Sequence, residues 1–282
     1  MKVSVIIPTY NEEESIGDCL LSLQSQNIDS YEIVVVDDGS TDKTVDIVKK
    51  FNDVKLFTQG HRGAGAARNL GTSKSQGEIL VFVDADMTFD KDFLKNLIKP
   101  INLPASGVGR TIIGTFSKEE YLANKDNVWA RCWNLNRGLP PDKMHPQNYP
   151  DYDRVFRAIS KEYFDRAGGF DESAGYTDDY SLSQKLGTMA VAAPNAIFYH
   201  KNPGTLKEVF IQSKWMAKRK YRLGLLGYLV ALARVSLPIS LVIGAILALR
   251  HQILEFIIFK VVSDFGQFIG ILEYLLGGKV SK

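Results

Sequence analysis

Three short apolar runs near the N-terminus alternate with polar turns and helical segments. The runs cover residues 3–7, 33–36 and 79–83, and each is rich in β-branched residues. Such runs are typical of strands that are covered on both faces of a parallel sheet. A helix is predicted after the first run by apolar residues at helical spacing: Ile16, Cys19, Leu20 and Leu23. This order predicts an α/β fold with a mostly parallel sheet flanked by helices.

Each of these runs ends in a polar turn. The turns comprise residues 8–13, 37–42 and 84–86. Because ligands bind beyond the carboxyl ends of parallel strands, we expect the three turns to line one crevice. Ser40 or Thr41 is expected to cap the helix that follows the second turn.

Asp84 and Asp86 stand one residue apart at the end of the third run. Two carboxylates in this position can hold a hard divalent cation between the protein and phosphate oxygens. Asp pairs also occur in ordinary surface turns, so the pair alone is weak evidence. The similar ends of the other two runs favour a metal and phosphate site.

Composition limits the partners and the compartment. The formal net charge of the 282 residues is only +2, so no nucleic-acid partner is expected. Cys19 falls on the apolar face of a predicted helix, far from Cys132, which predicts a buried thiol and suits a reducing compartment. The first apolar run stops at Pro8 and is too short for a signal peptide.

Six stretches in a fixed order carry a resemblance to a known family, the family 2 glycosyltransferases. These have a GT-A type, Rossmann-like fold, and the resemblance covers roughly residues 1–205. The matching stretches are residues 5–12, 36–42, 65–71, 82–86, 167–172 and 177–179. The resemblance implies an inverting enzyme that moves a sugar from a nucleoside-diphosphate sugar to a hydroxyl of a glycan or a lipid-linked saccharide.

The resemblance implies that Asp38 contacts the base of the nucleotide. A carboxylate can accept a hydrogen bond from a pyrimidine N–H, although Asp38 could instead only shape the turn. Pro8 and Tyr10 are expected at the same site. Glu12 is expected either to reach the base or ribose, or to cap the first helix. A UDP-sugar is the favoured donor, and a GDP-sugar is possible.

The small residues at 63–67 do not form a dinucleotide fingerprint. The third glycine is missing, and the segment does not directly follow the first predicted strand. They are expected to let a helix N-terminus pack close to the crevice, where its amides and Arg68 face the diphosphate. Asp86 is expected to bind Mn²⁺ or Mg²⁺, which assists departure of the diphosphate. Asp84 is expected to contact the ribose or support the metal. His200 is either a further metal ligand or merely exposed.

The resemblance implies that Asp179 is the general base, because a sugar hydroxyl must lose its proton to attack. Asp178 is expected to bind the acceptor. The alternative is that both residues cap a helix and complement its dipole. Asp178 stands where the family usually has Glu, and Ser181 replaces a further acidic residue. These departures bear on acceptor contacts and not on the reaction.

The C-terminal part is unusually apolar. Arg234 is the only charged residue between positions 223 and 249, and four charges occur between 253 and 276. A basic cluster with Trp215 precedes this part: Lys214, Lys218, Arg219, Lys220 and Arg222. We expect helices that associate with a membrane, as a hairpin or lying in the interface, with the catalytic domain on the cytoplasmic side. The alternative is a soluble arm that forms a homo-oligomer.

Three parts are therefore predicted: a nucleotide-sugar-binding half at 1–110, an acceptor-binding half at 111–205, and a membrane-associated helical extension at 206–282. Trp129 and Trp133, one helical turn apart, are expected to pack a core rather than stack on sugars.

Three other functions are alternatives to glycosyl transfer onto a hydroxyl. Transfer to a polyprenyl (dolichyl) phosphate would need no base. A non-catalytic nucleotide-sugar-binding membrane scaffold would bind the donor without turnover. A nucleotidyltransferase is disfavoured, because the chain lacks an N-terminal Gly-rich loop with a basic residue.

Overall fold

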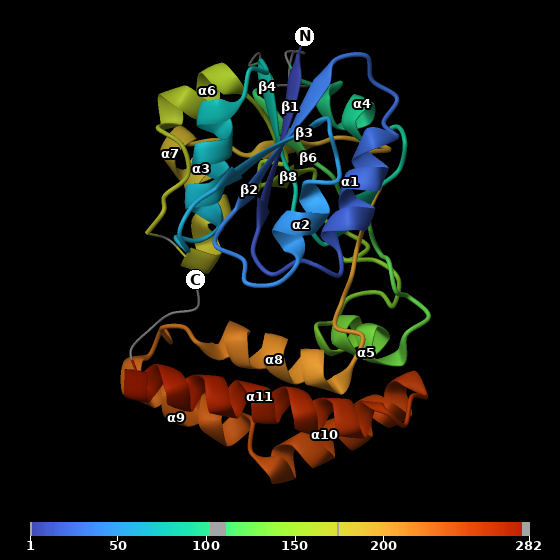
Figure 1. The fold of residues 1–282 in the computed structure, drawn as a ribbon. Helices are drawn as coiled ribbons and strands as arrows, with labels where there is room; N and C mark the ends of the chain where they lie inside the picture. The colour runs from blue at the N-terminus through green and yellow to red at the C-terminus, as the bar shows by residue number, and fades with distance from the viewer. Residues whose placement is uncertain (1, 102–110, 174, 278–282) are drawn as a thin grey trace. The chain divides into compact units, whose positions relative to one another are not determined.

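The computed structural model describes residues 2–101, 111–173 and 175–277 (Figure 1). These residues form two compact units. The first, the sheet unit, comprises the described residues up to 121 and those from 147 to 200. The second, the helical unit, comprises residues 122–146 and 201–277. The three functional parts expected from the sequence stay a prediction.

An eight-stranded sheet forms the centre of the sheet unit. Its order is β3 (Val54–Thr58), β2 (Tyr31–Asp37), β1 (Val3–Thr9), β4 (Ile79–Phe82), β9 (Ala158–Ser160), β6 (Gly114–Phe116), β10 (Ala190–Ala192) and β8 (Tyr152–Asp153). The first four strands are parallel, as are β6 and β10, whereas β9 and β8 run against their neighbours. The predicted α/β fold with a mostly parallel sheet is confirmed.

A second, three-stranded sheet has the order β5 (Met87–Phe89), β11 (Phe198–His200) and β7 (Glu120–Leu122). Strand β11 pairs antiparallel with β5, so that His200 lies opposite Met87. This pairing brings the end of β11 next to the turn that follows β4, although the two are more than 100 residues apart in sequence.

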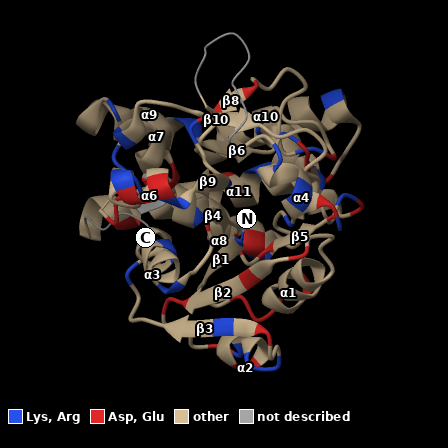
Figure 2. Ribbon diagram, turned by 90° about the horizontal axis from the view of Figure 1, so that it is seen from above, with Lys and Arg blue, Asp and Glu red and all other residues tan. Residues whose placement is uncertain are grey.

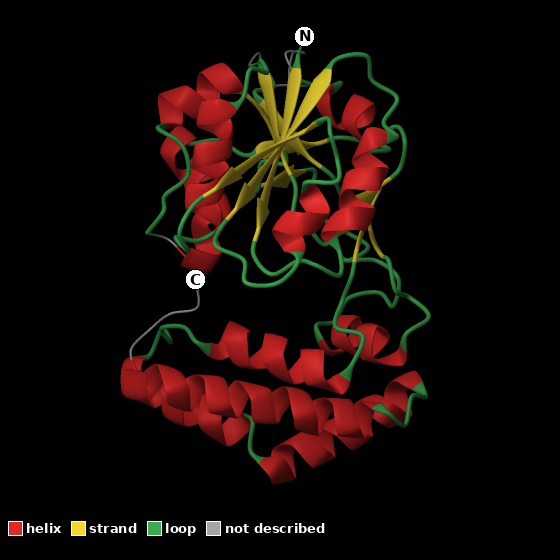
Figure 3. Ribbon diagram, in the orientation of Figure 1, coloured by secondary structure: helices red, strands yellow, loops and turns green. Residues whose placement is uncertain are grey.

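Helices cover both faces of the large sheet (Figure 3). One core contains side chains of α1 (Ile16–Gln24), α2 (Thr44–Val48) and α4 (Phe93–Ile98). The other contains side chains of α3 (Ala64–Lys74), α6 (Lys161–Ala167) and α7 (Ser181–Leu186). Alternation along β1 divides its residues between the cores, with Val5 and Ile7 in the first and Ile6 in the second. Apolar burial on both faces explains why these strands read as continuous apolar runs.

The first two helices can be compared residue by residue with the sequence prediction. The buried residues of α1 are the four predicted from their spacing, and Cys19 is a buried thiol. Helix α2 begins at Thr44 with Lys43 at its N-cap, so the predicted cap at Ser40 or Thr41 is wrong. The reason is local competition: Ser40 Oγ accepts the backbone N–H of Asn11 instead, and Asp42 accepts that of Thr44.

Charged side chains on the large sheet also pair across strands. In Figure 2, an acidic segment of β2 lies beside a basic segment of β3, and Lys55 Nζ is 2.7 Å from Glu32 Oε2. Burial raises the pKa of Glu32, but hydrogen bonds from Lys55, Ser4 and the backbone of Gln76 outweigh it and lower that pKa to about 2. The contact fastens the edge strand β3 to the rest of the sheet.

The helical unit contains α5 (Val128–Asn136), α8 (Leu206–Ala217), α9 (Gly224–Arg234), α10 (Leu237–His251) and α11 (Phe256–Gly277). Helix α11 packs against α8 and α10. Trp133 is buried in a core with Val209 and Phe259, and Trp129 packs against the same core. The prediction that the two tryptophans pack a core is confirmed.

The length and hydropathy of the helices in this unit bear on whether they could cross a membrane. No single helix among the described residues is long and apolar enough to cross a bilayer. Helices α9 and α10 satisfy both conditions only as a pair, and they are bent by 58° at the break between them. Membrane association stays a prediction at this point.

Candidate active site

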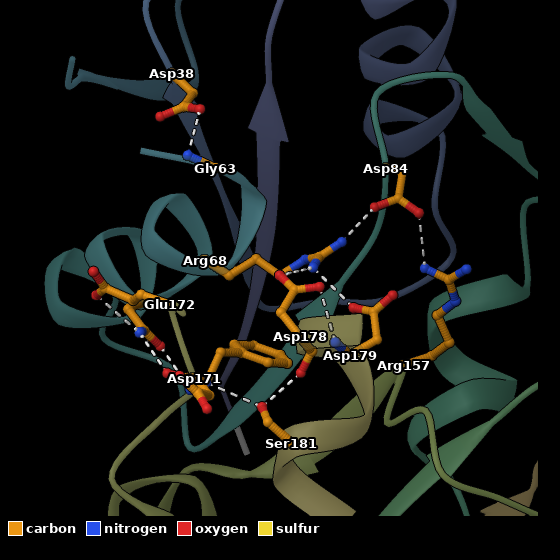
Figure 4. A network of polar contacts seen from close by, with 12 residues as sticks. Asp38, Gly63, Arg68, Asp84, Arg157, Asp171, Glu172, Asp178, Asp179 and Ser181 are labelled. Carbon is orange, nitrogen blue, oxygen red and sulfur yellow. Dashed lines mark hydrogen bonds and ion pairs between the residues drawn. The ribbon is translucent and has the colours of Figure 1, made fainter. Parts of the chain in front are cut away.

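The polar turns after β1, β2 and β4 lie at one edge of the sheet unit. The backbone register pairs Thr9 at the end of β1 with Asp37 at the end of β2, and Ile6 with Phe82 at the end of β4. Figure 4 shows Asp38 and Asp84, from two of these turns, near the N-terminal part of α3. The three polar turns therefore lie at the same edge of the sheet, as expected, and the crevice between them stays a prediction.

Asp38 is held by donors from the loop that precedes α3. Its Oδ1 accepts from Gln59 Nε2 at 2.7 Å and from the backbone N–H of Arg62 at 2.8 Å. Its Oδ2 accepts from the backbone N–H of Gly63 at 2.8 Å, and His61 Nδ1 lies 2.9 Å away. The carboxylate is buried and is held by this loop, whereas the turn after β2 is shaped by Asp37, which accepts the backbone N–H groups of Gly39 and Ser40. A base N–H would have to replace one of the donors to Asp38, so the base contact stays a prediction.

Tyr10 is an exposed aromatic residue at the same edge. Its ring stacks on that of His61, with 4.2 Å between the ring centroids, and 44% of the residue is exposed. Pro8 lies within β1 opposite Val36, two positions before Tyr10. A flat aromatic surface beside Asp38 suits a stacked base.

Glu12 connects the first turn to α1. Its carboxylate accepts from Ser15 Oγ at 2.5 Å, and its backbone oxygen accepts the N–H groups of Ser15 and Ile16. Burial raises the pKa of Glu12 to about 7, against the hydrogen bond from Ser15, and the charges of Asp86 and Asp84 raise it further. The contacts are those of a residue that starts a helix. The nucleotide contact of Glu12 stays a prediction.

Arg68 joins three carboxylates from distant parts of the chain (Figure 4). Its Nη2 lies 2.8 Å from Asp84 Oδ1, and its Nη1 lies 2.8 Å from Asp179 Oδ1. The same Nη1 is 3.1 Å from Asp178 Oδ2. Only 4% of Arg68 is exposed. Burial lowers its pKa, but the three carboxylates outweigh burial and raise it, so the guanidinium is charged.

Small residues explain how α3 brings Arg68 to this place. A Cβ on Gly71 would lie 2.6 Å from Ile6 Cγ2, so glycine permits α3 to lie close against β1. A Cβ on Gly65 would lie 2.8 Å from Asp178 Oδ2. The expected close packing of this helix N-terminus is confirmed. The contacts of Arg68 are with carboxylates, and its contact with a diphosphate stays a prediction.

Asp178 and Asp179 lie in a 3₁₀ helix, Gly175–Tyr180, that leads into α7. The N-cap of α7 is Tyr180, with no side-chain capping hydrogen bond, so neither aspartate caps α7. Within the 3₁₀ helix, Asp178 Oδ1 accepts the backbone N–H of Asp179 at 2.9 Å, so the structural alternative still holds for Asp178. Burial raises the pKa of Asp178 to about 6, although Arg68 opposes the shift. The Asp179 side chain is 36% exposed and therefore accessible to an acceptor.

Ser181, which replaces an acidic residue of the family, has a structural part here. Its hydroxyl donates to the backbone oxygen of Asp178 at 2.5 Å and accepts the backbone N–H of Asp171 at 3.1 Å. It thereby fixes the backbone on which Asp179 is carried.

Asp86 and His200 face one another across the turn between β4 and β5. His200 Nε2 lies 2.8 Å from Asp86 Oδ2, and His200 Nδ1 lies 2.9 Å from Glu120 Oε1. Burial lowers the pKa of His200, but Asp86 and Glu120 outweigh it and raise that pKa. The predicted proximity of Asp86 and His200 is thus observed.

These residues fit a divalent cation. A carboxylate oxygen and an imidazole nitrogen converge, and the other imidazole nitrogen is held by a carboxylate, as is usual for a metal-binding His. Within the described residues, no three or more His, Cys, Asp or Glu side chains are grouped to hold a metal ion. A cation here would therefore take its other ligands from diphosphate oxygens and water, as Mg²⁺ does in nucleotide sites.

Sequence reasoning missed two residues of this site. Arg157 Nη1 lies 3.2 Å from Asp84 Oδ2, and Glu120 is the partner of His200. Burial raises the pKa of Asp84, but Arg157 and Arg68 outweigh it and hold that pKa well below its usual range. Neither Arg157 nor Glu120 belongs to a recognisable motif. Arg157 and Glu120 could have been expected only from the general rule that a buried carboxylate or imidazole needs a polar partner.

The comparison with known proteins identifies the family. The model of glycosyl transferase family 2 matches residues 4–168, and the chain belongs to this family. A poly(ribitol-phosphate) beta-glucosyltransferase of Bacillus spizizenii is 43% identical over 165 residues, which are 55% of this chain and 23% of that protein. The matching part spans only 15% to 38% of the lengths of the curated relatives that it matches.

Solved structures share the fold. The mannosyltransferase PcManGT of Pyrobaculum calidifontis, in complex with GDP-Man and Mn²⁺, has a TM-score of 0.57 and 21% identity, covering 94% of this chain and 86% of that one. TarS 1–349 of Staphylococcus aureus, in complex with UDP, has a TM-score of 0.56 and 18% identity, covering 100% and 93%. The sheet unit therefore has the fold of GT-A glycosyltransferases.

Proposed function

We propose that this protein transfers a sugar from a nucleoside-diphosphate sugar to a hydroxyl of a glycan or a lipid-linked saccharide, with inversion at the anomeric carbon. The observation that carries the proposal is the network of Arg68. It places Asp84, at the expected donor and metal site, within one ion-pair cluster of the expected base Asp179. Membership of glycosyltransferase family 2 supports the same reaction.

The donor would lie along the carboxyl edge of the strands, with its base near Tyr10 and Asp38. A UDP-sugar is favoured, because TarS was solved with UDP, and a GDP-sugar remains the alternative, because PcManGT was solved with GDP-Man. A Mn²⁺ or Mg²⁺ ion held by Asp86 and His200 would neutralise negative charge on the departing diphosphate. Glu120 would hold the imidazole of His200 in the orientation that this requires.

Asp179 would take the proton of the acceptor hydroxyl as that oxygen attacks the anomeric carbon. The bond between this carbon and the diphosphate oxygen breaks on the opposite face, which inverts the configuration. Arg68 orients Asp179 through Oδ1 at 2.8 Å, and Ser181 fixes the backbone next to it. Holding the base in place before the acceptor arrives lowers the entropic part of the barrier.

The test is a donor panel with the full chain. Purified protein is mixed with UDP-Glc, UDP-GlcNAc, GDP-Man or a dTDP-sugar, with Mn²⁺ or Mg²⁺ and a membrane lipid extract, and released nucleoside diphosphate is measured. We expect release from one donor class, abolished by EDTA and increased by the extract. Donor binding without any release would overturn the proposal in favour of a non-catalytic scaffold.

A further inference from the structure

Helix α10 has its polar and apolar side chains in the opposite arrangement to a helix of a water-soluble bundle. The buried residues of α10 are small or polar: Ser240, Gly244 and Ala248. Five large apolar residues of the same helix are at least 45% exposed: Leu237, Leu241, Val242, Ile246 and Leu249. Leu247 packs against the core of this unit. A helix at the surface of a soluble protein turns its large apolar residues inward.

Close packing explains the buried side of α10. A Cβ on Gly244 would lie 3.0 Å from Ile257 Cα and 3.3 Å from Lys260 Cβ of α11, so a larger residue would push the two helices apart by a few tenths of an ångström. Small residues between closely packed helices, with large residues facing outward, are the usual arrangement where lipid surrounds the helices.

Charged groups are also hidden between α10 and α11. Lys260 Nζ lies 2.5 Å and 2.6 Å from the two carboxylate oxygens of Asp264, and Ser240 Oγ donates to Asp264 Oδ2 at 2.7 Å. Asp264 is 1% exposed and Lys260 is 8% exposed. Charged side chains of a helix exposed to lipid pair with one another on its protein-facing side in this way.

Helices α9 and α10 together carry a set of exposed apolar residues, here called the outer face. It consists of Leu225, Leu226, Leu229, Val230, Leu237, Leu241, Val242, Ile246 and Leu249. Each of these is 45% to 81% exposed. In Figure 1, α9 and α10 lie on one side of α11 and α8 lies on the other. An apolar surface of this extent is unusual for a monomeric soluble protein and marks an interaction site.

Charge identifies the partner. Between positions 209 and 254 the chain has no Asp or Glu and seven basic residues: Lys214, Lys218, Arg219, Lys220, Arg222, Arg234 and Arg250. Arg219, Lys220 and Arg222 are exposed directly before α9, while Arg234 and Arg250 lie near the ends of the two helices. Lys214 and Lys218 pair with Glu273 of α11, so the basic border consists of the other five residues. An apolar centre with such a border matches a bilayer with anionic headgroups. A second copy would instead bring like charges together, because a two-fold contact pairs the same surface with itself.

We propose that α9 and α10 bind the surface of an anionic bilayer, with the outer face buried in a single leaflet. Their 11 and 15 residues correspond to about 16 and 22 Å, which is less than the ~30 Å of a hydrocarbon core. The 58° bend keeps the pair from acting as one straight span. This binding goes beyond the proposed function, because it does not require a donor, a metal ion or turnover.

The test is flotation of the full chain with vesicles of phosphatidylcholine alone and of phosphatidylcholine with 30 mol% phosphatidylglycerol (roughly the charge density that favours basic segments). We expect the protein to float with the anionic vesicles and not with the neutral ones. The double variant Leu241→Glu/Val242→Glu should lower the bound fraction at least about tenfold, since two carboxylates replace buried apolar groups. Leu21→Glu is the matched control, because Leu21 is a 59% exposed leucine of the sheet unit.

The basic border is tested separately. Lys220→Glu/Arg222→Glu should weaken binding to the anionic vesicles roughly tenfold or more, whereas Lys50→Glu/Lys91→Glu, at exposed positions of the sheet unit, should leave it unchanged. Equal binding of all variants would overturn the proposal. So would a lipid-free dimer in analytical ultracentrifugation that Leu241→Glu/Val242→Glu dissociates, since a second copy would then cover the outer face.

Depth distinguishes one leaflet from a span. A fluorophore on Val242→Cys should be quenched more by a nitroxide near the headgroups than by one at the acyl-chain ends, because interfacial helices lie about 5–10 Å deep. Cys19 and Cys132 are buried and do not compete for the label. Stronger quenching by the deep nitroxide would overturn the single-leaflet arrangement.

Discussion

The carboxylates on the two sides of the carboxyl edge of the sheet are held in different ways. Asp38 is surrounded by backbone and neutral side-chain donors from one short loop, together with His61. Asp84, Asp178 and Asp179 instead share one buried cation, Arg68, that comes from another helix. Backbone donors hold a carboxylate in one place, because their positions are fixed by the loop itself. A shared guanidinium can give up one partner and keep the others.

This difference has a consequence for the reaction. A group that only shapes the donor site works best when it does not move. A general base must first be oriented and then be able to accept a proton, and its charge changes while it does so. The neighbouring charges of Asp84 and Asp178 keep Arg68 paired throughout that change. The following predictions test whether the two sides differ in this way.

Asp179→Asn should have the largest effect. If Asp179 is the base, its loss should lower turnover by about 10²- to 10⁴-fold while donor affinity stays the same, since the proposed partner of Asp179 is the acceptor and not the donor. Nucleoside-diphosphate release and calorimetric donor binding measure the two quantities. Asp165→Asn, which changes an exposed carboxylate on α6, is the control. Full turnover of Asp179→Asn would mean that the acceptor is already an anion, such as a polyprenyl phosphate.

Arg68→Ala should strongly destabilise the sheet unit. It leaves three carboxylates close together without their shared cation, which should lower the free energy of unfolding by about 3–5 kcal/mol. Arg62→Ala is the matched control, because Arg62 pairs with Glu172 on the surface and is 62% exposed in its side chain. Its loss should cost less than about 1 kcal/mol. Urea unfolding of both variants measures the two losses in free energy of unfolding. Similar losses would contradict the idea that the three carboxylates depend on Arg68 as their shared cation.

Asp38→Asn should have a smaller effect. An amide offers one acceptor oxygen where the carboxylate offers two, so the N–H of Arg62 or Gly63 loses its partner, at a cost of about 1–3 kcal/mol. Thermal unfolding is the measurement, and Asp53→Asn, at an exposed position, serves for comparison. If the two variants unfold alike, the loop does not depend on Asp38.

Asp178→Asn should change how stability depends on pH. Burial raises the pKa of Asp178 to about 6, above the 3.8 of an unperturbed Asp. Between these values the folded protein binds more protons than the unfolded chain, so the contribution of Asp178 to stability increases as pH falls from about 6 to 4. Relative to Asp178→Asn, the unaltered protein should gain about 1–2 kcal/mol over this interval. A flat difference between the two unfolding curves, or one of opposite slope, would show that Asp178 is not perturbed.

The sequence by itself determined the strands of the parallel sheet, the helical face of α1 and the edge at which the polar turns meet. These features depend on local periodicity and on the topology of parallel sheets, both of which a single chain displays. The helix start after β2 was predicted wrongly, because Ser40 binds the backbone N–H of Asn11 while Asp42, a neighbouring polar residue, binds that of Thr44.

Only the tertiary structure decided which charges pair. Arg68 is 110 residues from Asp178, and Glu120 is 80 residues from His200. The distance at which α3 packs on β1 and the pairing of β11 with β5 bring these groups together. The apolar C-terminal stretch was evident in the sequence, but its outward orientation was not. That orientation follows from the close packing of Gly244 on α11, which no local pattern encodes.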